Sequence, residues 1–321
     1  MDHQEGAIYC FHPLIGDWFL ERIGEPTEIQ SRAWPVIAAG RHALITAPTG
    51  SGKTLAAFLW AINQLITGAW SAGRTRVLYV SPLKALNNDI RRNLITPLEG
   101  LKAHFRGAGA AFPEICVLTR SGDTPAEERR QMLRRPPEIL ITTPESLNIM
   151  VSSRGGRAML TGIATVILDE IHAVVGTKRG THLITAVERL VRLSGEFQRI
   201  ALSATVKPLP GVAAFVGGYV QKGGARAPRY EKRRVAVIES RRKKRSEIRV
   251  AFPPAAREHL VDASWWPLLA ETFRGIIRES GSTLLFTNSR RTAEKATRLI
   301  NEGEPQELAY AHHGSLSREI R

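Results

Sequence analysis

A run of small residues at positions 47–54, "APTGSGKT", ends in a lysine and a hydroxyl residue. It follows the apolar run "ALIT" (43–46) and opens a helical pattern, the setting that a phosphate-binding loop requires. A glycine-rich turn before a helix directs several backbone N–H groups and the helix dipole at one anion. Ala47 replaces the first glycine of the strict pattern but is still small. Lys53 would reach the β- and γ-phosphates of a nucleotide, and Thr54 would bind Mg²⁺. The candidate phosphate-binding residues are Thr49, Gly50, Ser51, Gly52, Lys53 and Thr54.

Two carboxylates, Asp169 and Glu170, follow the apolar run "VIL" (166–168), at the strand end where open α/β sheets bind ligands. Asp169 would hold Mg²⁺ through water, and Glu170 would orient or deprotonate the attacking water. Both side chains could instead cap the following helix. The upstream phosphate loop and the nearby His172 favour the catalytic interpretation. The candidate catalytic residues are Lys53, Asp169, Glu170 and His172, and the candidate metal ligands are Thr54 and Asp169.

Short β-branched runs alternate with longer amphipathic stretches along the first two thirds of the chain. Runs that are apolar throughout and separated by helices predict a parallel sheet covered on both faces. The repeated units predict an α/β, doubly wound domain over residues 25–220. The helices include 83–95 and 181–193, and the strands are 43–46, 76–81, 114–119, 138–143, 165–169 and 199–204.

The composition is strongly basic, with 45 Lys and Arg against 30 Asp and Glu among 321 residues, a net charge of +15. This balance favours a polyanionic partner, although a general solubility charge would also produce it. Cys10 and Cys116 are too few for a disulfide framework and fit a reducing, cytoplasmic setting. The N-terminus lacks an apolar run, so no signal peptide is expected. Residues 54–73 carry no charge but contain polar residues, which favours a buried helix over a membrane span.

The composition changes after residue 221. Residues 222–249 are rich in Lys and Arg and contain short strand candidates at 233–239 and 247–252. The segment is interpreted as a linker or hairpin, either a solvated connector or a surface facing nucleic acid. A helix starting near Trp265 and Trp266, a strand at 283–288, a helix at 290–302 and a strand at 307–314 then follow. The predicted domains are therefore 1–221, a basic linker 222–262, and the beginning of a second α/β domain at 263–321.

Taken together, these residues resemble a superfamily 2 helicase of the DEAD/DEAH-box kind. "EPTEIQ" (25–30) is similar to the Q-motif, "SPLKALNND" (81–89) to motif Ia and "TTPESL" (142–147) to motif Ib. "DEIH" (169–172) and "LSAT" (202–205) resemble motifs II and III. With "RSGDTP" (120–125) and "TKRGTH" (177–182), the combination looks most like the large helicase-related (Lhr) family. The resemblance runs from about residue 11 to the last residue.

The resemblance implies a RecA-like P-loop NTPase domain with a parallel sheet, plus the start of a second RecA-like domain. ATP and Mg²⁺ would lie between two such domains, with single-stranded DNA or RNA across their top. It implies that Gln30 reads adenine and that Ser203 and Thr205 couple the γ-phosphate to domain closure. Backbone contacts suit such a motor because they carry no sequence information. The implied nucleic-acid-binding residues are Pro82, Lys84, Thr142, Thr143, Asn288, Arg290 and His313.

The sequence contains neither motif V nor motif VI, which supplies an arginine finger worth about 10³–10⁵ in rate. Residues 1–321 are therefore expected to bind Mg-ATP and a strand with little hydrolysis and no unwinding. The alternative is a binding module without turnover, active only with a second chain that supplies motifs V and VI. The second domain is expected to be marginal alone, because about 50 residues bury little surface. An unrelated small-molecule kinase would leave motifs Ia, Ib and III unexplained.

Overall fold

A computed structural model describes residues 5–82, 84–204, 206–223, 228–240, 248, 250, 251 and 265–313. The side chains of residues 5, 6 and 84–93 are not among those described. The chain divides into two compact units, residues 1–244 and 245–321. Unit 1 is built on one large sheet, and the described part of unit 2 contains two helices.

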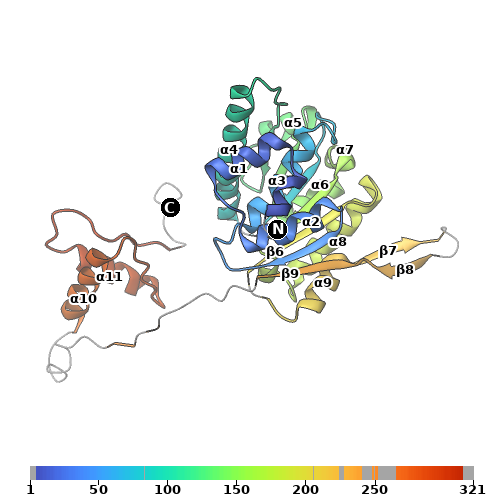
Figure 1. Ribbon diagram of the computed structural model, residues 1–321. Helices are drawn as coiled ribbons and strands as arrows, with labels where there is room; N and C mark the ends of the chain where they lie inside the picture. Colours follow the sequence, from blue (N-terminus) through green and yellow to red (C-terminus); the bar gives the residue numbers. More distant parts are fainter. Residues whose placement is uncertain are drawn as a thin grey trace. The chain divides into compact units, whose positions relative to one another are not determined.

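The sheet of unit 1 has seven strands in the order β3-β4-β2-β5-β6-β1-β9, and all of its pairings are parallel. Figure 1 shows β6 and β9 of this sheet among the helices of unit 1. Its central strands β2, β4 and β5 are buried at every position, as their uninterrupted apolar runs predict. The strands are β1 (His42–Thr46), β2 (Val77–Val80), β3 (Val117–Arg120), β4 (Ile139–Thr142), β5 (Thr165–Leu168), β6 (Gln198–Ser203) and β9 (Val235–Glu239). The predicted α/β class with a parallel sheet is confirmed.

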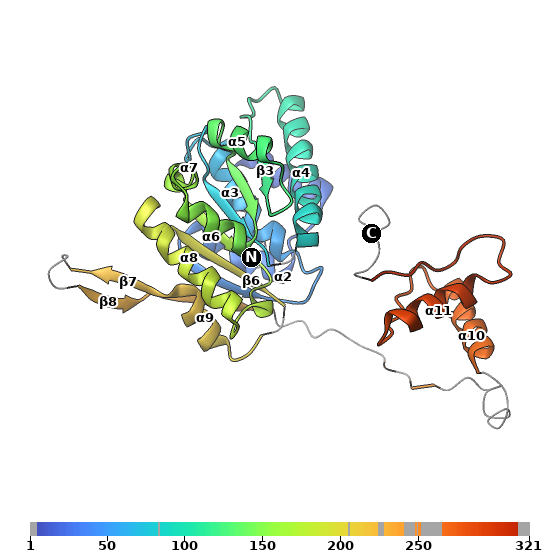
Figure 2. The same ribbon diagram turned by 180° about the vertical axis from the view of Figure 1, so that it is seen from behind.

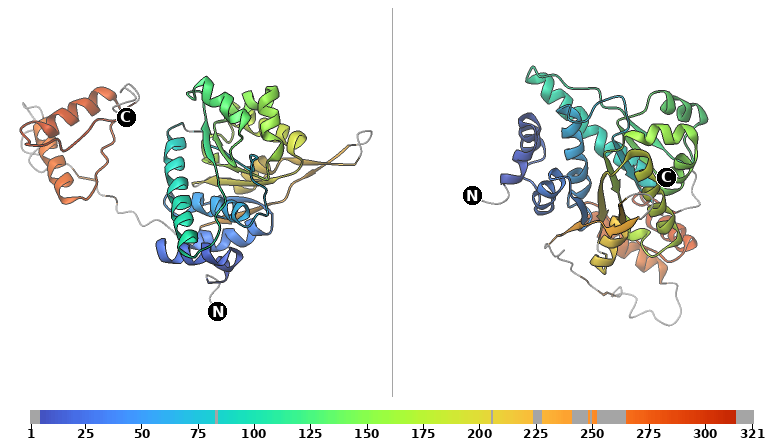
Figure 3. Two further views of the ribbon diagram at one scale, coloured as in Figure 1. Left: turned by 90° about the horizontal axis from the view of Figure 1, so that it is seen from above. Right: turned by 90° about the vertical axis from the view of Figure 1, so that its right-hand side faces the viewer.

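Two apolar clusters cover the two faces of the sheet, because successive strand side chains point to opposite sides. Ala43 and Ile45 belong to one cluster, whereas Leu44 between them belongs to the other. Figures 2 and 3 show the helices in a layer on each face. The first face carries η1 (Glu5–Cys10), α1 (Pro13–Arg22), α2 (Glu28–Ala38), α3 (Lys53–Ile66) and α4 (Lys84–Gly107). The second carries α5 (Ala126–Arg134), α6 (Pro144–Ser152), α7 (Arg154–Met159), η2 (Leu160–Gly162), η3 (Ile171–Ala173), α8 (Lys178–Ser194) and α9 (Leu209–Gly217).

Helix α3 is the uncharged stretch that the sequence placed in the core. Nine of its residues are buried, and the seven apolar ones pack in the first apolar cluster. Among the described residues, none of the helices combines the length and apolar character needed to span a bilayer. The charge-free stretch is therefore a core helix, as predicted.

The strand candidate at 233–239 forms as β9, but it belongs to the main sheet and not to the predicted linker or hairpin 222–262. β9 pairs in parallel with β1 over His42–Thr46 and forms an edge of the main sheet, so unit 1 extends past residue 221. Its Ile238 is buried in the first cluster, which explains why the apolar half of this charged segment joins the core. Before it, β7 (Tyr219–Lys222) and β8 (Arg229–Lys232) form an antiparallel hairpin that projects from the sheet (Figure 2).

In unit 2, α10 (Trp266–Glu279) and α11 (Arg290–Asn301) form where the two helices were predicted. Arg274 joins them by donating to the carbonyls of Leu299, Ile300 and Glu302 at the end of α11. The predicted strands at 283–288 and 307–314 are wrong for residues 283–288 and 307–313, which carry no strand pairing. A strand requires a hydrogen-bonded neighbour, and the described part of unit 2 supplies none. Gly314 lies outside the described residues.

Candidate nucleotide site

The phosphate loop connects β1 to α3 in the predicted manner. Gly50 and Gly52 adopt positive φ angles of +78° and +84°, a backbone conformation that side-chain-bearing residues rarely take. Gly52 is also the N-cap of α3, so the helix begins directly at Lys53. The free N–H groups of the first helical turn therefore lie at the loop, which is the arrangement that binds phosphate.

Lys53 is 8% exposed, and its ammonium lies inside the loop. Its Nζ donates to the carbonyl oxygens of Ala47, at 2.5 Å, and Pro48, at 2.8 Å. Burial lowers the pKa of Lys53, against the opposing influence of Glu170 and Asp169. Such a desolvated cation gains from exchanging neutral carbonyls for a phosphate oxygen.

Asp169 and Glu170 follow β5 on the same edge of the sheet as the phosphate loop. Asp169 is buried and accepts hydrogen bonds from the hydroxyl of Tyr79 and, at 2.8 Å, from the N–H of Glu170. Glu170 has a φ of +46° and makes no side-chain cap to the three-residue helix η3 that follows. The capping alternative therefore fails for Glu170, whose side chain remains available to a ligand.

One cavity of about 420 Å³ brings the predicted phosphate and metal ligands together. It contains all six candidate loop residues together with both carboxylates. Sequence reasoning missed the apolar part of its wall, because these residues come from α3 and from the distant α4. Those lining residues are Leu55, Phe58, Leu94 and Pro97.

Gln30 lies against the phosphate loop and is almost fully buried. Its Oε1 accepts from the N–H of Thr27 at 2.9 Å, completing a capping box at the start of α2. Its Nε2 donates to the carbonyl of Gly52 at 3.4 Å, and a Cβ added at Gly52 would lie 2.6 Å from that nitrogen. The hydroxyl of Thr27 reaches Ser51 O at 2.9 Å, a contact that the sequence did not reveal. Contact of Gln30 with adenine stays a prediction.

His172 connects the ends of β5 and β6. Its Nδ1 lies 3.2 Å from Oε2 of Glu170, 3.4 Å from the hydroxyl of Ser203 and 3.3 Å from the N–H of Ala204. The candidate coupling residue Ser203 is thus within reach of the candidate catalytic carboxylate through one ring. Thr205, the other coupling candidate, lies outside the described residues.

Motifs Ia and Ib meet on the same sheet edge, where Ser81 N–H donates to Thr142 O at 3.0 Å. Pro82, Thr142 and Thr143 are buried there. The hydroxyl of Thr142 donates to Arg120 O at 2.7 Å, and that of Thr143 caps α6 by accepting from Ser146 N–H at 3.3 Å. Both hydroxyls thus have internal partners, and nucleic-acid contact at these positions stays a prediction.

The remaining candidates have less structural support. The side chain of Lys84, the first residue of α4, is outside the description. In unit 2, Asn288 and Arg290 are exposed, and His313 Nε2 lies 3.0 Å from Glu294 on α11. Contact of these three residues with nucleic acid therefore also stays a prediction.

Replacing Asp169 by asparagine is expected to raise the unfolding temperature of the nucleotide-free protein. Burial raises the pKa of Asp169, although Tyr79 and the N–H of Glu170 oppose the shift. The folded state therefore holds the ionised carboxylate less readily than the unfolded chain does, and the charge costs stability at neutral pH. That cost disappears as the pH falls through the raised pKa to the ordinary value, so the two proteins should converge in acid. Calorimetry of the two proteins at neutral and at acidic pH measures the difference in unfolding temperature, and each kcal/mol corresponds to about 2–4 °C. A lower unfolding temperature of the variant at neutral pH would contradict the prediction.

Comparison with known proteins agrees with this geometry. The family model for DEAD/DEAH box helicases matches residues 27–210. The chain is 41% identical to the Lhr helicase/probable uracil glycosylase of Mycolicibacterium smegmatis, over 97% of this chain and 22% of that protein. It is also 41% identical to the Lhr helicase/uracil glycosylase of Escherichia coli, over 91% of this chain and 20% of that protein. The chain thus spans about a fifth of the length of these curated relatives.

A solved structure gives the same result for the fold. The structure of Mycobacterium smegmatis helicase Lhr bound to ssDNA and AMP-PNP superposes with a TM-score of 0.83 at 43% identity. The match covers 98% of this chain and 39% of that one.

Proposed function

The chain belongs to the DEAD/DEAH box helicases, and we propose that it binds Mg-ATP in the cavity at the carboxyl edge of its sheet and single-stranded DNA or RNA beside it. In this proposal it is the ATP-binding part of a superfamily 2 motor of the Lhr kind. The observation that supports the proposal most strongly is that the phosphate loop, Lys53, Asp169 and Glu170 line one cavity.

The chemistry follows from what each group has to offer. The N–H groups at the start of α3 hold the β-phosphate, and Lys53 exchanges its loop carbonyls for β- and γ-phosphate oxygens. Thr54 and Asp169 line the same cavity and are oxygen donors of the kind that Mg²⁺ prefers. Bound Mg²⁺ would neutralise phosphate charge as the terminal bond breaks. Glu170 orients the attacking water, because its carboxylate does not cap η3.

Coupling between nucleotide and strand would run through His172 and Ser203, since these side chains join the carboxylate loop to the end of β6. The strand would contact motifs Ia and Ib, at Pro82, Lys84, Thr142 and Thr143, and unit 2 at Asn288, Arg290 and His313. For the polypeptide of residues 1–321 we expect binding with slow hydrolysis and no unwinding. A second polypeptide that carries motifs V and VI would raise hydrolysis by about 10³–10⁵ by adding an arginine finger.

The proposal is tested by linked binding. Adding Mg²⁺ and a non-hydrolysable ATP analogue is expected to change the affinity for a labelled single-stranded oligonucleotide by about 5–150-fold, measured by fluorescence anisotropy. The oligonucleotide must change the affinity for the analogue by the same factor, because coupling free energy is reciprocal. Binding of the analogue that leaves strand affinity unchanged would reduce the chain to two uncoupled sites. A phosphate-release assay on the same samples separates slow turnover from none.

A further inference from the structure

We propose that the β7–β8 hairpin binds a segment of single-stranded nucleic acid at the N-terminal ends of the parallel strands, whereas the nucleotide site lies at their C-terminal ends. This inference takes its class of ligand from the proposed function. It adds a second nucleic-acid site, distinct from the predicted track, by which we mean the proposed contacts at motifs Ia and Ib. Three features of the hairpin support it: its exposure, its chemistry and its rigid attachment.

The hairpin contributes little to the core. All eight of its strand residues are exposed or only half-buried, and seven are exposed. Tyr219 and Tyr230 are 51% and 63% exposed. Two large exposed aromatic rings offer apolar surface to an external partner.

The strand register places both rings on the same face. Tyr219 pairs with Lys232, and Gln221 pairs with Tyr230, so these four side chains share one side of the antiparallel ribbon. The two tyrosines are diagonal neighbours, and the Cα atoms of such neighbours lie about 7–8 Å apart. That separation allows each ring to stack on a different base of one strand, a contact that is tolerant of sequence.

The charges around the rings favour a polyanion over another apolar surface. The two strands carry Lys222, Arg229 and Lys232 against the single acid Glu231, and Arg234 follows directly. Within the described part of the chain, no acid pairs with any of these four cations, whereas Arg233 between them is fully paired with Glu188 and Glu196. Of the strand cations, Lys232 shares the face of the two rings, whereas Lys222 and Arg229 lie on the opposite face of the ribbon with Glu231. A cation next to exposed rings, with further cations close by, is the usual composition of a single-strand-binding surface.

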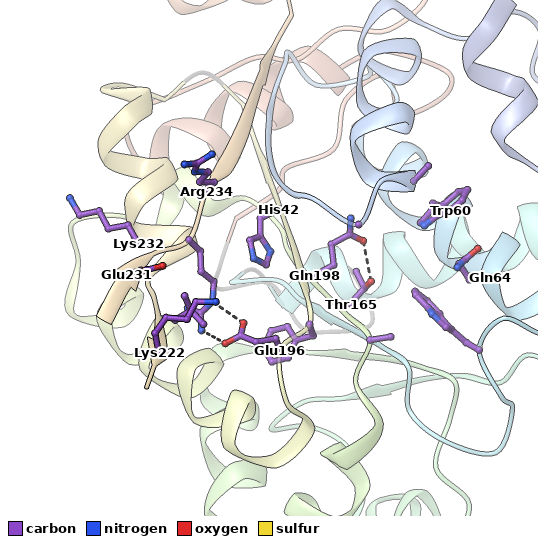
Figure 4. Close-up of a pocket in the computed structure, with 17 residues that line it drawn as sticks. His42, Trp60, Gln64, Thr165, Glu196, Gln198, Lys222, Glu231, Lys232 and Arg234 are labelled. Carbon is purple, nitrogen blue, oxygen red and sulfur yellow. Dashed lines mark hydrogen bonds and ion pairs between the residues drawn. The ribbon is translucent and has the colours of Figure 1, made fainter. Parts of the chain in front are cut away.

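A pocket of about 730 Å³ lies at the base of the hairpin, where Lys222, Lys232 and Arg234 line it and neither tyrosine does. Figure 4 shows His42 at its centre, Trp60 on one side, and Lys222, Lys232 and Arg234 on the other. The strands β1, β5 and β6 begin at this pocket, with His42, Thr165 and Gln198, whereas the phosphate loop and Asp169 follow strand ends. The hairpin site therefore lies at the N-terminal ends of the parallel strands, and the nucleotide site lies at their C-terminal ends.

The hairpin is attached firmly enough to present a defined surface. Arg233 makes a two-pronged contact to Glu196, at 2.8 and 2.9 Å, and a third bond to Glu188 at 2.9 Å. β8 then continues into β9, which is a strand of the main sheet. The base of the hairpin is thus fixed to unit 1 before binding, which favours affinity.

The test counts oligonucleotides bound per chain, using residues 1–321 and labelled oligothymidylate or oligouridylate of about eight nucleotides. The double variant Tyr219→Ala, Tyr230→Ala is expected to weaken one of two binding events by at least about tenfold. Changing Lys222, Lys232 and Arg234 to glutamine should reduce the salt dependence of the same binding event. The slope of log K against the logarithm of the salt concentration should become shallower by about two. The matched controls are Tyr9→Ala, a more exposed ring elsewhere, and glutamine at the exposed Arg154, Arg157 and Lys178.

The variant Lys84→Glu, in the predicted track, separates this proposal from the proposed function. One oligonucleotide per chain, weakened by Lys84→Glu and unchanged by the tyrosine variant, overturns the hairpin site alone. One oligonucleotide lost with the tyrosines and unchanged by Lys84→Glu supports the hairpin and contradicts the track. Poly-glutamate that binds as tightly as the oligonucleotides, with no dependence on the tyrosines, would show an acidic-polypeptide site and overturn the proposal. Because Tyr219, Tyr230, Lys222, Lys232 and Arg234 are exposed, the unfolding midpoints of the hairpin variants should not change.

Discussion

Lys53→Ala is expected to lower the affinity for a fluorescent ATP analogue by at least about 100-fold. The ammonium is buried inside the loop, where it already makes two hydrogen bonds that a phosphate would take over. Charge-assisted hydrogen bonds contribute about 1.5–3 kcal/mol each, so losing two costs about 3 kcal/mol or more. Titration of the analogue by fluorescence, with and without Mg²⁺, measures the loss.

Two controls separate binding from folding in this experiment. Lys178→Ala removes an exposed lysine at the start of α8 and should leave affinity unchanged. The unfolding midpoint of Lys53→Ala should remain near that of the unaltered protein, because the variant also removes a charge that burial disfavours. Full affinity in a folded Lys53→Ala protein would show that the loop does not bind phosphate.

Glu188→Ala is expected to destabilise unit 1 by about 2–3 kcal/mol. Glu188 bonds to Arg199 at 2.7 Å and Arg233 at 2.9 Å, and the side chains of these arginines are 0% and 4% exposed. Removing one partner of a buried pair leaves an uncompensated charge, which typically costs about 3–5 kcal/mol. Glu188 itself is 35% exposed, so water softens the loss and the lower value applies.

The matched control is Glu145→Ala, which breaks the exposed pair to Arg179 at 2.6 Å. Its side chains are 54% and 39% exposed, and the expected change is below about 1 kcal/mol. Urea unfolding of both variants gives the comparison, with Glu188→Gln as a variant that keeps a hydrogen-bond acceptor. Equal losses for Glu188→Ala and Glu145→Ala would show that the buried arginines find other compensation.

The pH dependence of the same cluster has a definite sign. Hydrogen bonds from Arg233 lower the pKa of Glu196. A carboxyl whose pKa is lower in the folded state adds stability above its ordinary pKa, and that stability is lost as the pH falls toward the lowered value. Lowering the pH should therefore weaken the attachment of β8 and β9, because Glu196 takes up a proton and loses its charged interaction with Arg233.

The parts of the fold that the sequence predicted are those that depend on neighbours along the chain. Apolar runs such as Val77–Val80 and Ile139–Thr142 identify buried parallel strands, because each run needs only its own composition to be recognised. The phosphate loop is equally local, since its glycines, lysine and helix start are consecutive.

The missed features all depend on residues that are far apart in sequence. The strand at 233–239 was predicted, but its pairing with β1 in the main sheet was missed, because the arginines before it indicated a connector. Nothing in the sequence distinguishes Arg199, Glu188 and Arg233 from surface residues. Only the fold brings them together and buries the two arginines. Conversely, 283–288 and 307–313 have strand composition without a described partner strand, and composition alone does not form a sheet.

The two amide atoms of Gln30 give the nucleotide site an unusual support. One atom completes the first turn of α2 and the other holds the carbonyl of Gly52, so the loop is shaped from outside before any ligand arrives. The conformational entropy of ordering the loop is then lost during folding instead of during binding. Loosening the first turn of α2, which need not touch the phosphates, would therefore also lower the affinity of the loop for its ligand.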